Sequence, residues 1–314
     1  MFGKQDNLRL ISGSCTNSLS QKIAKNLGTR LTDVTSEAFS DGELHVQIDE
    51  NVRGVDVFII QSTASPAENL LELLLLIDAC KRSSADRVTA VLPYFGYARQ
   101  DRKDRPRVPI TAKLVANLLV GAGVDRVLTM DLHAPQIQGF FDIPLDHLLA
   151  APVLLDHVER MHLQPSCIVG PDVGSVKMAR AFAKRLGADL AIVDKRRAAP
   201  NVSESMNLIG DVEGRHVYIL DDMIDTAGTL VQAAQLCADS GALSVNATAT
   251  HAVLSGPAKK RIDDSPLASL AVTNSLDLDS SRMPDNCTVL DIAPLLAEAI
   301  RRIHNAESVS SLFV

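Results

Sequence analysis

The chain contains the segment Val217-Tyr218-Ile219-Leu220-Asp221-Asp222-Met223-Ile224-Asp225-Thr226-Ala227-Gly228-Thr229. The segment opens as an apolar run, passes through acidic residues and a short polar loop, and then enters a helix-like stretch at residues 229–240. Apolar runs without alternation are typical of strands that are buried on both faces of a sheet. The segment therefore predicts a strand–loop–helix unit of a parallel α/β sheet.

The same alternation of strand and helix extends outward along the chain. Further strands are expected at residues 8–12, 55–61, 87–92, 126–130, 167–170, 190–194 and 245–250. Helices are expected between them, at residues 66–83, 110–121, 176–186 and 229–240. This order favours mostly parallel sheets with helices on both faces, and such sheets bind ligands beyond the carboxyl ends of their strands.

A weak internal repeat relates the two halves of the chain. Residues 54–60 resemble residues 214–220, and a helix and a second apolar strand follow each copy. The copies differ directly after the first strand, where the second copy has Asp221 and Asp222 and the first has Gln61-Ser62. We therefore expect two similar α/β domains, of which only the second carries the acidic ligand site.

The length of 314 residues agrees with two domains, because a single core rarely grows beyond about 250–300 residues. We place an N-terminal domain at residues 1–147 and a C-terminal domain at residues 148–314. A helix at about residues 291–305 is the part of the second domain that could pack back on the first.

Composition and charge exclude several kinds of partner. The chain has 31 Lys and Arg against 38 Asp and Glu, a net charge of −7, and no Trp, which argues against a nucleic-acid surface. The densest apolar run, residues 70–77, is too short to span a membrane and contains Glu72. The five Cys form no CxxC pair, as expected for reduced thiols. We expect a cytoplasmic protein that binds neither nucleic acid nor membrane.

The loop of residues 225–229 predicts a phosphate cradle. Its backbone N–H groups lie at the start of a helix, where the helix dipole favours an anion. Thr226 and Thr229 add hydroxyl donors, and no Lys follows Gly228, so the loop is not a Walker A motif. The preceding acids suit the hydroxyls of a sugar, which indicates a sugar phosphate. The alternative is an ordinary turn capped by Thr229, but paired acids at a buried strand end are costly without a ligand.

This loop and four further motifs resemble one enzyme family. The loop looks like the phosphoribosyl-pyrophosphate binding loop of phosphoribosyltransferases and ribose-phosphate pyrophosphokinases. The other motifs resemble ribose-phosphate pyrophosphokinases of the phosphate-dependent, bacterial-type class, from Arg9 to Phe313. Ordinary phosphoribosyltransferases have no counterpart to the first half, and the implied fold is phosphoribosyltransferase-like in each domain. The motifs are Phe39-Ser40-Asp41-Gly42-Glu43, Arg99-Gln100-Asp101-Arg102, Asp131-Leu132-His133 and Asp194-Lys195-Arg196-Arg197.

The resemblance implies roles for the first-domain motifs. Phe39 and Arg99 would lie on the two faces of adenine, because a ring and a guanidinium plane both stack on a flat base. Mg²⁺ is the implied cofactor, at His133 and Asp172. Mg²⁺ prefers oxygen ligands, so a direct metal ligand and a phosphate donor both stay open for His133. The implied ATP-binding residues are Phe39, Asp41, Gly42, Glu43, Arg99 and Gln100.

The second domain would bind ribose 5-phosphate and carry the catalytic loop. The resemblance makes Lys195 and Arg197 catalytic. The residues implied for ribose 5-phosphate are Arg197, Asp221, Asp222, Asp225, Thr226, Ala227, Gly228 and Thr229. Bacterial relatives often carry Gly where Ala227 stands, and we expect an ordinary backbone conformation at this residue.

Regulation and assembly are also implied by the resemblance alone. A regulatory phosphate would bind at Arg53, Ser308 and Ser310, with inorganic phosphate as activator, ADP as inhibitor and a homohexamer as the assembly. Pro106 and Asn51 depart from the family pattern near this site, so the strength of regulation is not predicted.

The expected reaction is transfer of the diphosphoryl group of ATP to the 1-hydroxyl of ribose 5-phosphate, for nucleotide biosynthesis. Two alternatives stay open. A phosphoribosyltransferase would need a nucleobase pocket and would not use the ATP motifs. A regulatory subunit without activity would be expected to carry insertions or an altered catalytic loop.

Overall fold

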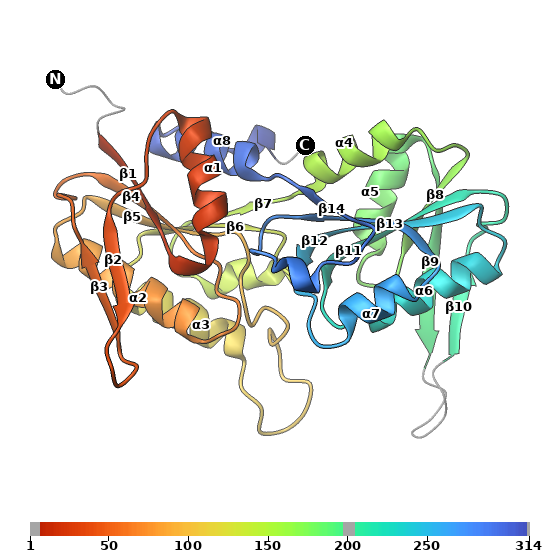
Figure 1. The fold of residues 1–314 in the computed structure, drawn as a ribbon, viewed down its shortest axis with the longest axis horizontal. Coiled ribbons are helices and arrows are strands. Elements are labelled where there is room, and N and C mark those ends of the chain that lie inside the picture. Colours follow the sequence, from red (N-terminus) through yellow and green to blue (C-terminus); the bar gives the residue numbers. More distant parts are fainter. Residues whose placement is uncertain (1–6, 197–204, 313–314) are drawn as a thin grey trace. The chain divides into compact units, whose positions relative to one another are not determined.

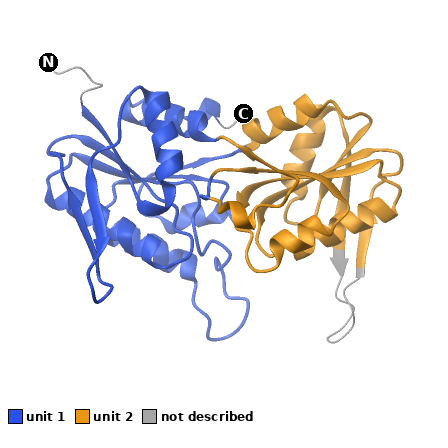
Figure 2. Ribbon diagram, in the orientation of Figure 1, with its two compact units in different colours: residues 1–150, 275–277, 292–314 blue, residues 151–274, 278–291 orange. Residues whose placement is uncertain are grey.

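The computed structural model of the chain describes residues 7–196 and 205–312 (Figure 1). The chain divides into two compact units (Figure 2). Unit 1 consists of residues 1–150, 275–277 and 292–314, and unit 2 consists of residues 151–274 and 278–291. No helix of the described ranges is both long and apolar enough to cross a membrane.

Unit 1 is built on a parallel sheet with helices on both faces (Figure 1). One face of the sheet forms a core with α2 (Glu68–Arg82) and α3 (Thr111–Ala122). The helices α1 (Asn17–Leu27) and α8 (Ala293–His304), which pack against each other, lie over the other face (Figure 1). All residues of β4 are buried, as the apolar run of residues 57–60 predicts. The strand order is β1 (Leu8–Ser12), β4 (Asp56–Ile60), β5 (Arg87–Leu92), β6 (Arg126–Met130) and β7 (Leu145–Leu148).

Unit 2 is built on a larger sheet, parallel except for one antiparallel hairpin at its edge. Its core contains α6 (Gly228–Asp239) and α7 (Ala258–Asp263). The helices α4 (Ala151–Met161) and α5 (Val176–Leu186) cover the other face (Figure 1). The strand order is β10 (Ser205–Ile209), β9 (Asp189–Arg196), β8 (Ser166–Gly170), β11 (His216–Ile224), β12 (Ser244–Ala252), β13 (Leu267–Thr273) and β14 (Cys287–Leu290).

The two sheets share one topology. The order β1-β4-β5-β6-β7 in unit 1 matches β8-β11-β12-β13-β14 in unit 2. In each unit a hairpin also follows the α-helix that comes after the first of these matched strands: β2 (Val34–Ala38) with β3 (Leu44–Ile48) after β1 and α1, and β9 with β10 after β8 and α5. The repeat read from residues 54–60 and 214–220 therefore corresponds to β4 and β11. It also makes the β2–β3 hairpin the counterpart of the β9–β10 hairpin.

Neither unit is a continuous half of the chain. The first segment of unit 1 ends at Ala150, against the predicted boundary after residue 147. The C-terminal segment 292–314 belongs to unit 1, so the second unit does not run to residue 314. The physical reason is that α8 packs on α1 and is anchored at its end. His304 Nδ1 lies 2.8 Å from Asp56 Oδ2, and Arg87 donates to the Ile303 carbonyl at 3.1 Å.

Candidate active site

The acidic pair of unit 2, Asp221 and Asp222, lies where β11 is no longer paired with β8. β8 pairs with β11 only as far as Ile219, whereas β12 continues alongside β11 to Ile224. Asp221 and Asp222 therefore lie beyond the end of the β8–β11 ladder. The pKa of the Asp221 carboxyl is raised well above its usual range, first by burial and then by the carboxylates of Asp222 and Asp172. The site concentrates negative charge that a ligand with hydroxyl donors or a cation would relieve.

The loop after β11 has a conformation that corrects one prediction. Ala227 is in the left-handed region, at φ 60° and ψ 8°, directly before α6. An ordinary conformation was expected there, and this expectation is wrong. The loop must turn sharply for α6 to begin at Gly228, and an L-residue in this region costs about 1–2 kcal/mol. The first N–H groups of α6 have no partner within the helix, as a phosphate cradle requires.

Two residues that the sequence did not point to fix this loop. Ser255 donates its backbone N–H to the Asp225 carbonyl at 2.9 Å, and its hydroxyl donates to the Asp225 carboxylate. Arg261 of α7 donates to the Thr226 carbonyl at 2.9 Å and places a guanidinium beside the cradle. Some 30 residues separate these partners in the chain, so no local pattern could have revealed them.

The loop after β8 brings Asp172 to the same end of the sheet. Asp172 Oδ1 accepts a hydrogen bond of 2.9 Å from the Ser175 N–H, so the loop closes on itself, and the Asp172 side chain stays exposed. No group of three or more His, Cys, Asp or Glu within residues 7–196 and 205–312 could hold a metal ion. A Mg²⁺ ion held by one or two carboxylates, water and substrate phosphates needs no such group, and the carboxylate oxygens of Asp172 fit that chemistry.

The structure describes only part of the predicted catalytic loop. Lys195 lies in β9, and its backbone pairs with Met206 of β10. Arg197 lies outside the described residues.

The predicted ATP motif lies at the tip of the β2–β3 hairpin. Gly42 donates to the Phe39 carbonyl at 2.9 Å, with φ at 94°, and Glu43 donates to Asp41 Oδ1 at 3.1 Å. The Phe39 ring is 53% exposed and lies 5.3 Å from the His45 ring, centroid to centroid. An exposed ring that is held at the tip of a tight hairpin can stack on a base.

Arg99 and Gln100 lie in the loop beyond β5. Gly96 fixes the start of this loop, because a Cβ at this residue would lie 2.0 Å from the Thr63 carbonyl oxygen. Gln100 accepts a hydrogen bond of 2.5 Å from the Thr111 hydroxyl at the start of α3. The Arg99 side chain is exposed.

His133 lies in the neighbouring loop beyond β6, and its side chain is exposed. Gln136 joins the two loops by donating to Asp101 Oδ2 at 2.8 Å. The loops that carry Arg99, Gln100 and His133 therefore lie side by side in unit 1.

The predicted regulatory residues are only partly brought together. Ser308 Oγ accepts a hydrogen bond of 3.2 Å from the Ser310 N–H. Arg302 of α8 donates to the Ser308 carbonyl at 3.1 Å, and this cation was not among the predicted residues. Arg53 lies in the turn after β3, where its N–H bonds to Asn51 Oδ1 at 3.0 Å. Within the described part of the chain, no hydrogen bond or ion pair joins Arg53 to either serine.

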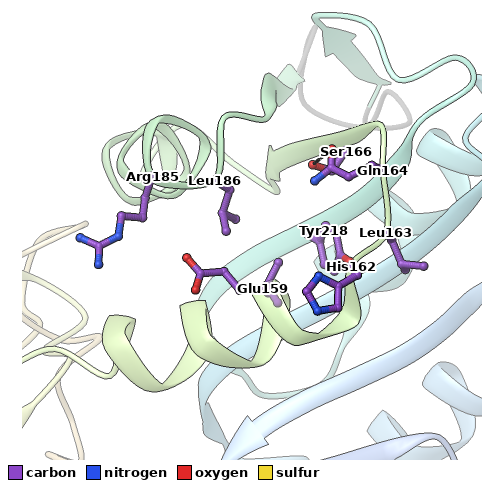
Figure 3. A pocket seen from close by; sticks show the side chains of 9 residues that line it. Glu159, His162, Leu163, Gln164, Ser166, Arg185, Leu186 and Tyr218 are labelled. Carbon is purple, nitrogen blue, oxygen red and sulfur yellow. Dashed lines mark hydrogen bonds between the residues drawn. The ribbon is translucent and has the colours of Figure 1, made fainter.

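A separate hollow of about 310 Å³ lies at the amino ends of β8 and β11 (Figure 3). Its lining includes Ser166, Tyr218 and His162, together with Glu159 of α4 and Arg185 of α5 (Figure 3). Ligands of parallel sheets bind at the carboxyl ends of strands, so this hollow is distinct from the Asp221 site.

The fold and the acid-lined cradle define a class of protein: an α/β transferase of the phosphoribosyltransferase-like fold. Comparison with models of protein families narrows this class. The model for the N-terminal domain of ribose phosphate pyrophosphokinase matches residues 8–123, and the model for the phosphoribosyl synthetase-associated domain matches residues 195–314. The chain belongs to the ribose phosphate pyrophosphokinase family.

Relatives and a solved structure agree with this assignment. The chain is 57% identical over 310 residues to a ribose-phosphate pyrophosphokinase of Chlorobaculum tepidum, covering 98% of this chain and 95% of the relative. It is 54% identical to that of Campylobacter jejuni, covering 98% and 99%. The crystal structure of phosphoribosylpyrophosphate synthetase from Mycobacterium smegmatis matches with a TM-score of 0.91 at 42% identity, over 96% of this chain and 99% of that one.

Proposed function

We infer that the chain is a ribose-phosphate diphosphokinase, which transfers the β,γ-diphosphoryl group of ATP to the 1-hydroxyl of ribose 5-phosphate. The observation that carries this inference is that the likeness covers both units, including unit 1, which a phosphoribosyltransferase would not need. The sugar oxygen forms a bond to the β-phosphorus, the bond from that phosphorus to the bridging oxygen of AMP breaks, and the hydroxyl proton is released. AMP and 5-phosphoribosyl 1-diphosphate are the products.

The roles of the site residues are part of the proposal. Phe39 and Arg99 hold the adenine, and Asp41, Gly42, Glu43 and Gln100 complete the ATP site. The loop of residues 225–229 holds the 5-phosphate, and Asp221 and Asp222 accept the ribose hydroxyls. Exposed rings, a helix start and paired acids are the groups that such substrates require.

Charge stabilisation is assigned to Lys195 and Arg197. Diphosphoryl transfer depends on positioning and on stabilising charge at the transferred and leaving oxygens. Asp172 and His133 would hold Mg²⁺, which neutralises the phosphate oxygens when it is bound. A cytoplasmic homohexamer, activated by phosphate at Arg53, Ser308 and Ser310 and inhibited by ADP, completes the proposal.

The test is a coupled assay of AMP release from ATP, with ribose 5-phosphate present and omitted. AMP that forms only with ribose 5-phosphate supports the function. Consumption of a nucleobase with 5-phosphoribosyl 1-diphosphate would instead favour the phosphoribosyltransferase alternative. A chain that releases no AMP at any concentration of inorganic phosphate would favour the regulatory subunit without activity.

A further inference from the structure

Unit 1 contains a buried polar cluster at the position that corresponds to the acidic site of unit 2. Its centre is Glu72 of α2, which is 3% exposed. Glu72 Oε2 accepts hydrogen bonds from the Ser14 N–H at 3.1 Å, the Ser14 hydroxyl at 2.6 Å and Gln61 Nε2 at 2.7 Å. Glu72 Oε1 accepts from the Ser36 hydroxyl at 2.7 Å. No ion pair involves Glu72 among residues 7–196 and 205–312, so neutral donors alone satisfy this carboxylate.

The shared topology gives this cluster its meaning. Gln61 directly follows β4, as the acids follow the buried run of β11, and Ser14 follows β1 as Asp172 follows β8. In unit 2 these two places present acids, of which Asp172 is exposed and Asp221 and Asp222 are half-buried. In unit 1 the Gln61 amide fills the space: a Cβ on Gly13 would lie 2.2 Å from Gln61 Oε1. The second ligand position of the duplicated fold is therefore closed by the side chains of unit 1 itself.

The cluster also reaches the hairpin that carries the ATP motif. Ser36 lies in β2, and Phe39 follows three residues later. Val46 and Ile48 of β3 pack on the same core as Leu73 and Leu76 of α2, but apolar contacts are not directional. A hydrogen bond to a charged acceptor is directional and about twice as strong as a neutral one.

We propose that Glu72 is a positioning residue that holds the β2–β3 hairpin through Ser36 and so sets Phe39 and its neighbours for ATP. The inference rests on the proposed function, because it assigns the ATP site to this hairpin. The carboxylate links three segments, the loop after β1, the end of β4 and the hairpin, to one helix. The hairpin is thereby placed before the nucleotide arrives, which lowers the ordering cost of binding.

The test is Ser36→Ala, which removes the link and leaves the buried cluster in place. The KM for ATP should rise about three- to tenfold, the worth of one hydrogen bond, while kcat and the KM for ribose 5-phosphate stay near the wild-type values. Ser36→Thr keeps the hydroxyl and suits a strand, so it should restore the KM for ATP. Thr35→Ala is the matched control, because Thr35 lies next to Ser36 but bonds to Asp49 Oδ2 at 2.9 Å.

Two variants of Glu72 distinguish the effect of its hydrogen bond to Ser36 from the effect of its negative charge. Glu72→Gln keeps one oxygen for Ser14 and Gln61 and can donate to the Ser36 oxygen, so its KM for ATP should stay near the wild-type value. Glu72→Ala should raise it at least as much as Ser36→Ala does. An active wild-type enzyme with an unchanged KM for ATP in Ser36→Ala would overturn the inference alone, and so would equal changes in Thr35→Ala. A wild-type chain that releases no AMP would instead overturn the proposed function.

Discussion

Asp221 links the chemistry of the site to the stability of the ligand-free protein. Its pKa in the folded state is raised to about 8, chiefly by burial and then by the Asp222 carboxylate. Above about pH 4 the unfolded chain has released the proton of this carboxyl group. The folded protein still holds that proton until the pH approaches its raised pKa. The stability from this group is fully present below the unfolded pKa, and it is lost as the pH rises through the folded pKa.

We expect Asp221→Asn to be more stable than the wild type near pH 8 and no more stable below about pH 4. The neutral amide removes the buried charge, and the gain is on the order of 2 kcal/mol, or a few degrees in Tm. Thermal unfolding across this pH range checks the prediction. Parallel curves for the two proteins would show that the Asp221 carboxyl does not titrate in this window.

The same acids should govern the affinity for the sugar. We expect Asp221→Ala with Asp222→Ala to raise the KM for ribose 5-phosphate on the order of 10²-fold, because two hydrogen bonds to partly buried carboxyl groups are lost. ATP binding should change little. Steady-state kinetics with each substrate varied is the measurement, and Asp239→Ala, an acid on the exposed part of α6, is the control. Unchanged ribose 5-phosphate kinetics would remove these residues from the acceptor site.

Single residues also show where sequence reasoning stops. The acids at the end of β11 could be predicted, because residue type and position within one local segment were enough. Arg261 and Glu72 could not, because their partners lie in other elements. The error at Ala227 has another cause. Ala normally avoids the left-handed region, but the chain must turn sharply into α6, and this requirement determines the conformation of Ala227.

At the scale of elements, most strands of the two sheets were predictable, including the edge strand β1, but β7, β13 and β14 were not. β4 and β5 consist mostly of buried apolar residues, and the predicted ranges differ from the observed ones by a residue or less at each end. β7 and β14 are short strands with partly exposed residues, so their sequences carry no clear period. The pairing of β9 with β10 depends on a partner across a loop, which a local pattern does not encode.

The β9–β10 hairpin contains the proposed catalytic residue Lys195. Lys195 lies near the end of β9, in the hairpin that corresponds to the β2–β3 hairpin of unit 1. We expect Lys195→Ala to lower kcat by on the order of 10²–10³, as removal of one preorganised donor does in other transferases and hydrolases. Substrate affinity should change little, since the interaction forms chiefly in the transition state.

Single-turnover rates, with ribose 5-phosphate binding measured separately, check this effect. Lys184→Ala, at the exposed end of α5, is a matched cation in the same unit. A near-normal kcat, or a defect confined to substrate affinity, would contradict the assignment.

For the whole molecule, the repeat predicted the duplication and the site difference but not the path of the chain. Two similar apolar strands sufficed to propose two similar domains, and the matching strand orders confirm the repeat. The sequence allowed the helix at about residues 291–305 to pack back on the first domain, as α8 does, but it could not decide this, because an amphipathic helix does not specify which apolar surface it covers.

Assembly and regulation belong to this scale. We expect a homohexamer by light scattering, with activity that rises with inorganic phosphate and falls with ADP. Arg302→Ala should weaken the activation by phosphate, because Arg302 holds Ser308 in place. A stable monomer that is fully active without phosphate would contradict both the assembly and the regulatory site.

The exchange of helices has a consequence for synthesis on the ribosome. α4 follows the last strand of unit 1 and belongs to unit 2, whereas α8 follows the last strand of unit 2 and belongs to unit 1. In the finished fold α8 covers the surface of α1 against which it packs. Because α8 is made last, unit 1 cannot be completed during translation of its own strands. The nascent chain must expose that surface until residue 304 has left the ribosome. Unit 1, whose strands are made first, is therefore completed after the strands of unit 2.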